Sequence, residues 1–238
     1  MRLDLSPDLT RNNVNAIIAG QQWGYLGPGS SATVMAGSGS FDNGTSTDAS
    51  SVRGLSPDGA FFSQTSAATT GSNCGTFQGE VFSQPRHLPE YTFAIAFDAV
   101  TSVRIFIGLI QEASELANAL DSNTLGAPGI GIQFSTPRGD TSFQAVSNGG
   151  SQTVTTLGVT PVANTLYIFR VKFISTSLAT ISIYSKTGVL LGSVNMTSNL
   201  PSSTQGMVAV VGVETEENVA KTIYHFHWYA RNFAYQLT

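Results

Sequence analysis

The chain has 238 residues, of which 11 are Lys or Arg and 15 are Asp or Glu, so its formal net charge at pH 7 is −4. Charged residues make up 11 % of the sequence and hydrophobic residues 41 %, a balance that predicts a folded domain with a polar, uncharged surface and argues against intrinsic disorder. The slight excess of acid argues against binding to a phosphate backbone, and the single cysteine, Cys74, excludes an internal disulfide framework.

The first 60 residues carry weaker signals than the rest of the chain. Residues 8–19 favour a short helix, although two Asn residues weaken it. Trp23 and Tyr25 follow in a glycine-containing turn. They either anchor an N-terminal arm to the body or to a neighbouring subunit, or begin a strand on the chain's own core. Residues 38–51 are typical of an exposed loop or hairpin.

Strands dominate from about residue 76 onward, because large apolar side chains alternate there with small or polar ones. The predicted strands are 91–97, 103–109, 130–134, 167–173, 181–183, 189–191, 207–213 and 224–228. Within 167–173, Arg170 and Lys172 belong to the face opposite the apolar set. The run 207–213 is apolar almost throughout, which predicts a strand covered on both faces, and Trp228 is expected in the core.

Residues 111–120 are the best helical candidate, since Leu116 and Leu120 are four apart and Glu112 lies early in the segment. The strands, spaced roughly ten residues apart with turn signals between them, predict an antiparallel sandwich or barrel. We therefore predict a single β-sandwich domain at residues 41–238, preceded by an N-terminal arm at residues 1–40.

Several segments resemble those of a known family in their amino-acid sequence and in their order along the chain. These segments are 91–97 (YTFAIAF), 104–109 (RIFIGL), 129–134 (GIGIQF), 139–144 (GDTSFQ), 156–159 (TLGV), 167–171 (YIFRV) and 199–201 (NLP). Residues 90–238 resemble the concanavalin A-like (laminin-G-like) jelly-roll domains of tailed-bacteriophage virion proteins. The resemblance implies an all-β fold, an antiparallel jelly-roll β-sandwich with one concave sheet, to which the sequence adds one short helix and an N-terminal arm.

His225 and His227 are two residues apart on a predicted strand, so their rings are expected on one face. Two imidazoles could share a metal ion, but a site needs at least a third ligand, and nothing nearby in the sequence supplies one. An exposed or half-buried strand face is the favoured interpretation, and no metal site is predicted.

Glu214, Glu216 and Glu217 form the densest acidic group in the sequence. Glycoside hydrolases need two carboxyl groups across the scissile bond. Laminarinase-like members of the same sandwich class carry Glu-x-Asp-x-x-Glu on one strand. Here the middle acid is Glu216, and Val219 stands where the second catalytic glutamate belongs, so no catalytic residue is predicted.

Asp140, Asn123 and Asp121 are candidates for calcium binding, because legume-lectin-like and laminin-G-like sandwiches often hold calcium near the rim. A hard cation needs six or more oxygen ligands, and turn formation explains residues 121–123 equally well. No cofactor is predicted.

The sequence thus favours a non-enzymatic virion structural protein, made in the host cytoplasm and acting as a capsid decoration, cement or head accessory protein. Its predicted partners are capsid or other virion proteins, including copies of itself, with a trimer as one arrangement, and neither nucleic acid nor a membrane. One alternative is a tail-fibre or receptor-binding module for host surface glycan, and a second is a laminarinase-like glycoside hydrolase. The candidate interaction residues are Trp23, Tyr25, Phe143, His225 and His227.

Overall fold

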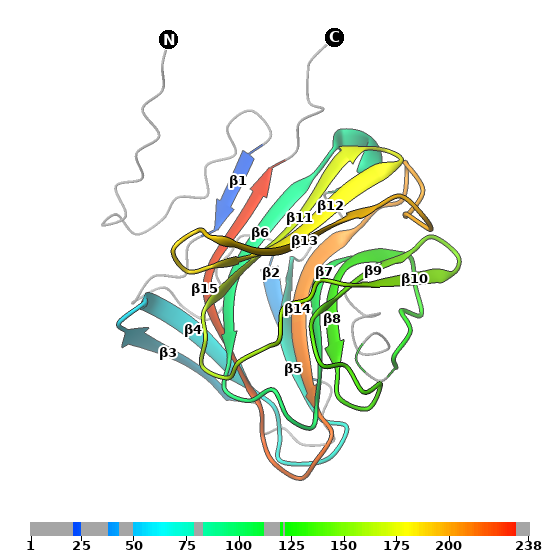
Figure 1. The fold of residues 1–238 in the computed structure, drawn as a ribbon. Helices are drawn as coiled ribbons and strands as arrows, with labels where there is room; N and C mark the ends of the chain where they lie inside the picture. The colour runs from blue at the N-terminus through cyan, green and yellow to red at the C-terminus, as the bar shows by residue number, and fades with distance from the viewer. Residues whose placement is uncertain are drawn as a thin grey trace, which may run out of the picture.

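The computed structural model describes residues 21–24, 38–42, 50–78, 83–111, 120 and 122–231 of the chain. Two antiparallel β-sheets stack face to face in these ranges, as Figure 1 shows. The predicted all-β sandwich is therefore confirmed. Among the described residues, no helix combines the length and the apolar character that crossing a membrane requires.

The first sheet, called sheet A, is built around the central strand β6. Its order is β13 (Leu190–Met196), β12 (Leu178–Ser185), β11 (Tyr167–Ser175), β6 (Glu90–Phe97), β15 (Thr222–Arg231), β4 (Gly59–Thr65) and β3 (Ser50–Ser56). The short β1 (Gln21–Gly24) also pairs with β15, along residues 228–231, whereas β4 pairs with residues 222–225. β1 therefore lies in line with β4 beside the same strand.

The second sheet, called sheet B, is built around β7 and β14. Its order is β10 (Gln152–Thr156), β9 (Gln144–Asn148), β8 (Gly129–Ser135), β7 (Val103–Ile110), β14 (Val208–Thr215), β5 (Asn73–Gln78) and β2 (Ser38–Asp42). A short 3-10 turn, η1 (Pro85–His87), precedes β6.

The main core fills the space between the sheets, and period-two alternation supplies its side chains. The most deeply buried large side chains include Phe93 and Phe97 from β6, Phe169 and Phe173 from β11, and Ile105 from β7. Every second side chain of β6 and β11 is therefore buried in the core, and the side chains between them lie on the outer face of sheet A.

A smaller core covers part of the outer face of sheet B. Phe106, Ile110, Val208 and Val210 contact one another there together with Leu120, Leu125 and Ala127. β14 is consequently buried on both faces, as the apolar run 207–213 predicts.

The structure adds strands that the sequence pattern did not predict, namely β3, β4, β5, β9 and β10. The predicted helix at 8–19 and most of that at 111–120 lie outside the described residues. The domain boundary at residue 40 stays a prediction, although β1, within the predicted arm, pairs with sheet A.

Two facing glycines set the close approach of β7 and β8. Gly108 and Gly131 are register partners, and a Cβ added to either would lie 2.3 Å from a backbone oxygen of the neighbouring strand. We predict that Gly108→Ala lowers stability by about 2 kcal/mol, because the strands must separate to admit the methyl group. Urea unfolding checks this, with Thr155→Ala on the exposed strand β10 as the control. Equal midpoints for the two variants would contradict the close packing.

Candidate functional site

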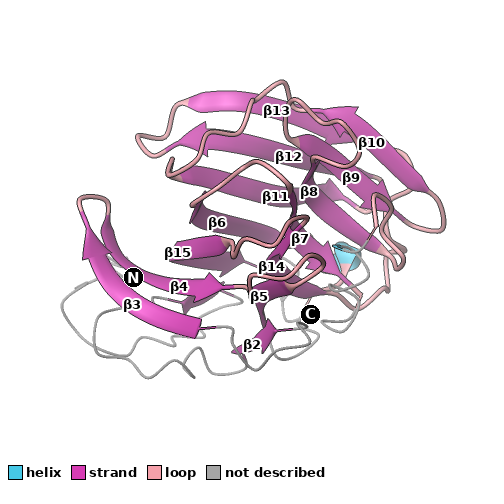
Figure 2. Cartoon of the chain, turned by 90° about the horizontal axis from the view of Figure 1, so that it is seen from below, coloured by secondary structure: helices cyan, strands magenta, loops and turns pink. Residues whose placement is uncertain are grey.

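The outer face of sheet A is concave, and the tips of two hairpins meet across it. Figure 2 shows the β3–β4 hairpin curling away from sheet B toward the side on which the β12–β13 turn lies. Lys186 in that turn and Asp58 at the tip of the β3–β4 hairpin form an ion pair of 2.8 Å. In the sheet β12 and β4 are four strand spacings apart, roughly 19 Å if flat. The contact therefore requires strong curvature, and we call the concave face below it the groove.

One side of the groove carries three aromatic rings, Phe61 of β4 and Tyr224 and Phe226 of β15. Phe61 meets Tyr224 edge-on at a centroid distance of 5.3 Å and Phe226 at 5.8 Å. All three side chains are half-buried. Their sequence neighbours Phe62 and His225 are buried on the opposite, inner face.

The floor of the groove is low because β6 presents small side chains between the two walls. Its outward residues are Thr92, Ala94 and Ala96, which alternate with the buried aromatic residues of the core. Because these side chains are small, they rise less far above the sheet than the aromatic and charged side chains on either side of them.

The other side of the groove contains a small hollow of about 240 Å³ over β11, β12 and β13. The polar side chains that line it are Arg170, Lys172, Thr180, Ser182, Tyr184 and Ser193. Its hydroxyl groups are already ordered, since Ser182 and Ser193 share a hydrogen bond of 2.8 Å and Thr180 donates one of 2.9 Å to Asn195.

Arg170 and Lys172 hold the carboxylate of Glu90 at the edge of this hollow. One Glu90 oxygen lies 2.5 Å from a guanidinium nitrogen of Arg170, and the other lies 3.6 Å from Nζ of Lys172. Burial opposes the charge of Arg170, but its hydrogen bond to Tyr184 and its ion pair with Glu90 outweigh burial and raise the pKa of Arg170. The guanidinium therefore stays charged.

Two of the five interaction residues predicted from the sequence are buried in the core. Phe143 and His225 are 0 % exposed, so neither presents a surface to a partner. Phe143 packs edge-on against Phe134 and Phe169 in the core. Trp23 lies in β1, while Tyr25 is outside the described residues.

A β-bulge corrects the prediction that His225 and His227 share a face. The pairing of β15 with β6 shifts register between these two residues, so the simple alternation is interrupted there. Beyond the shift Trp228 turns inward, as expected, and meets Phe93 edge-on at 5.0 Å. Tyr224 and Phe226 remain on the outer side with Phe61, so strict alternation along the predicted strand 224–228, which would place them on the same face as Trp228, does not hold.

The acidic group singled out in the sequence is paired with two cations outside the groove. Glu214, in β14 of sheet B, and Glu216 lie 2.7 and 2.6 Å from the same guanidinium nitrogen of Arg104. Glu217 pairs with Nζ of Lys221 at 2.5 Å. Each carboxylate thus has a cationic partner within the fold.

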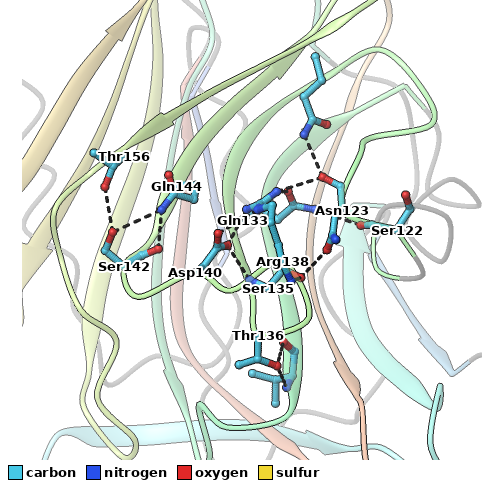
Figure 3. A network of polar contacts seen from close by, with 12 residues as sticks. Ser122, Asn123, Gln133, Ser135, Thr136, Arg138, Asp140, Ser142, Gln144 and Thr156 are labelled. Carbon is cyan, nitrogen blue, oxygen red and sulfur yellow. Dashed lines mark hydrogen bonds and ion pairs between the residues drawn. The ribbon is translucent and has the colours of Figure 1, made fainter.

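Asp140 and Asn123, the calcium candidates, are brought together around a guanidinium group (Figure 3). Arg138 donates two hydrogen bonds to the carboxylate of Asp140, at 2.9 and 2.6 Å, and one of 3.0 Å to the backbone oxygen of Asn123. Asp140 also accepts a 2.8 Å bond from the backbone N–H of Ser135. The cation beside Asp140 is therefore Arg138, and Asp121 lies outside the described residues.

Sequence reasoning did not single out the groove residues as a site. The one sequence feature that pointed to these residues was the alternation in β11, which placed Arg170 and Lys172 on the face opposite the apolar side chains. The aromatic side could not be recognised, because Phe61 lies in a hairpin that the pattern did not predict and Tyr224 and Phe226 read as core residues.

The comparisons with known proteins identify a family and a fold. A family model described as SO2946-like, C-terminal domain, matches residues 56–224. The crystal structure of SO2946 from Shewanella oneidensis MR-1, a protein of unknown function, is 13 % identical, with a TM-score of 0.63 over 94 % of this chain and 92 % of that one. No curated protein matches the sequence.

Two further solved structures share the fold at low identity. The carbohydrate recognition domain of Emp47p has a TM-score of 0.53 and 10 % identity, over 84 % of this chain and 90 % of that one. An endo-β-1,4-glucuronan lyase from the fungus Trichoderma reesei has a TM-score of 0.52 and 10 % identity, over 78 % of this chain and 87 % of that one. These likenesses support the concanavalin A-like sandwich and carry no information about activity.

The buried His225 predicts a specific loss of stability in acid. Burial lowers its pKa from 6.5 to about 3. Between these values the unfolded chain binds a proton that the folded chain does not, so lowering the pH through this window costs up to about 1.4 kcal/mol per pH unit. We expect the stability of His225→Gln, measured by urea unfolding at pH 6.5, 5.5 and 4.5, to fall less steeply than that of the unaltered chain. Parallel curves would contradict this account.

The Arg138–Asp140 pair predicts a second stability effect. The Asp140 side chain is 8 % exposed, so Arg138→Met leaves a largely buried carboxylate without its cation. We expect a loss of about 3 kcal/mol in urea unfolding. Adding Asp140→Asn to this variant removes the charge and should recover part of the loss. A double variant less stable than Arg138→Met would contradict the electrostatic explanation.

Proposed function

The chain belongs to the SO2946-like C-terminal domain family, and from this premise and the groove of sheet A we propose that it is a non-enzymatic protein that binds a carbohydrate chain. The observation that carries the proposal is the cluster of Phe61, Tyr224 and Phe226 on the concave face. Half-buried rings on a surface can use their remaining exposed faces to stack against the apolar faces of sugar rings.

The shape of the groove supports an elongated ligand. The aromatic side and the polar hollow lie on opposite sides of the low floor of β6, so a chain crossing the strands would meet both. Aromatic stacking supplies most of the contact area, and ordered polar groups fix orientation, which is the usual division in ligand sites. The carbohydrate recognition domain of Emp47p shares this fold, which makes the proposal compatible with the architecture.

The carboxylates argue for binding without hydrolysis. Glu90 beside the hollow is held by Arg170 and Lys172, and Asp58 at the hairpin tip is held by Lys186. A glycosidase needs one carboxyl as an acid and another as a nucleophile or base across the sugar. We propose that the carboxylates of the described part of the groove form no such pair, so the hydrolase alternative is not favoured.

The setting of this binding follows from the sequence resemblance. We propose that the protein is part of a tailed-bacteriophage virion, made in the host cytoplasm, and that it acts there as a tail-fibre or receptor-binding module for host surface glycan. Homo-oligomer formation, with a trimer as one arrangement, belongs to the same proposal, because several copies multiply a weak glycan affinity.

A second candidate is the decoration or head accessory protein that the sequence favours. The observation in its favour is an apolar surface at the β12–β13 turn, where Val189, Leu190 and Leu191 are 60, 54 and 44 % exposed. Exposed apolar side chains gathered in one place often mark a protein contact. Antibody labelling of intact particles separates the candidates: label on the head supports this one, and label on the tail supports the receptor-binding module.

Substitution of the aromatic side tests the glycan proposal. A glycan array probed with the full chain first identifies a ligand. We then expect Tyr224→Ala and Phe61→Ala each to weaken its binding by about tenfold, or about 1.4 kcal/mol, in calorimetric titration, because each removes a stacking surface. Val162→Ala, which shortens an exposed apolar side chain of the loop before β11, is the matched control. A chain that binds no glycan on the array, or variants that bind as the unaltered chain does, would contradict the proposal.

A further inference from the structure

The hollow beside β11 has hydroxyl groups in its middle and an apolar side chain at each end. Strand register pairs Ser182 of β12 with Ser193 of β13, and Thr180 lies two residues before Ser182 on the same face. Beyond Thr180 the hollow is bounded by Ile174 of β11, which is 45 % exposed, and at the other end by Leu190, which is 54 % exposed. A ligand group that enters the hollow therefore meets hydroxyls and apolar surface together.

Two hydroxyl groups of the hollow have a proton to donate to a ligand. Ser182 and Ser193 share a hydrogen bond of 2.8 Å, and whichever oxygen accepts it keeps its own proton. The oxygen of Tyr184 accepts a long bond of 3.4 Å from Arg170, and its phenolic proton has no acceptor among the described residues. These donors suit a carbonyl oxygen, which accepts hydrogen bonds and donates none.

Thr180 supplies the opposite function, an oxygen that accepts. It donates its proton to the side-chain oxygen of Asn195 at 2.9 Å, so it offers only lone pairs to a ligand. Thr180 and Ser182 are two residues apart on β12, so their Cα atoms are roughly 7 Å apart. A secondary amide fits between an acceptor and a donor placed in this way, because its N–H and C=O point in opposite directions.

The size and the ion pairs of the hollow suit a small neutral group. Its volume of about 240 Å³ is below the roughly 300–1,000 Å³ of pockets that bury a whole drug-sized ligand, so it suits one substituted sugar residue. A neutral group competes for none of the charges of Glu90, Arg170 and Lys172, so the contacts between them stay intact when it enters.

We infer that the hollow binds the acetamido group of an N-acetylhexosamine in the carbohydrate chain that crosses the groove. The amide N–H donates to Thr180, and the carbonyl oxygen accepts from the pair of Ser182 and Ser193. In a trans amide the methyl group lies on the side of the N–H, so it packs against Ile174 beyond Thr180. This inference rests on the proposed function, since it names the class of carbohydrate for the same groove.

The test is a glycan array with matched pairs of oligosaccharides that differ only in an acetamido or a hydroxyl group at carbon 2. The pairs include chitotetraose with cellotetraose and N-acetyllactosamine with lactose, and rhamnose oligosaccharides present a methyl group without an amide. We expect the full chain to bind the acetamido members about tenfold more tightly, because they add hydrogen bonds and a buried methyl group. This ratio should be the same in 50 and 500 mM NaCl, because salt screens charge attraction and the acetamido group is neutral.

Two variants locate the preference, each with a matched control. Thr180→Val removes the acceptor for the N–H at nearly constant shape, and Ile174→Thr replaces the apolar contact for the methyl group. Each should lower the affinity ratio within the best pair about threefold. Thr155→Val on β10 and Val162→Thr in the loop before β11 change exposed side chains outside the hollow and should leave the ratio unchanged. The array and the salt series need no variant to fold.

The outcomes separate this inference from the function on which it rests. Equal binding within the pairs, or tighter binding of the hydroxyl members, would overturn the acetamido assignment and leave carbohydrate binding intact. Tighter binding of the rhamnose oligosaccharides would overturn it in favour of a deoxy sugar, and a preference that falls steeply with salt would overturn it in favour of charge recognition. A blank array would overturn the proposed function and the inference together.

Discussion

The positions of the outward-facing side chains of sheet A depend on how the two sheets bury each other's inner faces. The inner faces of β6 and β11 supply Phe93, Phe97 and Phe169 to a core that is closed to solvent. Because side chains alternate along a strand, burying one set fixes the other set on the outside with equal precision. The small residues of β6 and the charged residues of β11 therefore face outward as a consequence of the core, and they lie at fixed positions on a rigid sheet.

The outer faces of the two sheets differ, because that of sheet A is curved and that of sheet B is partly covered. Sheet A bends until the Asp58–Lys186 ion pair joins the tips of two hairpins that are well separated in strand order. An exposed ion pair contributes little to stability. This pair is informative because it shows how closely the two hairpin tips approach each other. The outer face of sheet B instead carries a second apolar cluster that includes Leu120 and Leu125, and the Arg138 network, which holds the backbone oxygen of Asn123.

The fold could be predicted from the sequence because the alternation that marks a strand lies within a few consecutive residues. Alternation located β6, β7, β8, β11 and β15, and the continuous apolar run of β14 correctly indicated a strand buried on both faces. The site was far harder to predict, since it combines β4 and β15 with β11 and β12 through pairing that no local pattern records. The bulge between His225 and His227 shows the limit clearly: one register shift changes which side of the sheet the following residues occupy. The Arg138–Asp140 pair was missed as such because the acid was considered without the cation two residues away.

The most direct test of the central claim is a crystal structure of the full chain with the best oligosaccharide from the array. The account predicts sugar rings on the outer face of sheet A, stacked on Phe61 and Tyr224 and extending over β6 toward Arg170 and Lys172. Sugar bound at the edge loops of the sandwich or on sheet B, with the groove of sheet A unoccupied in the complex, would contradict it.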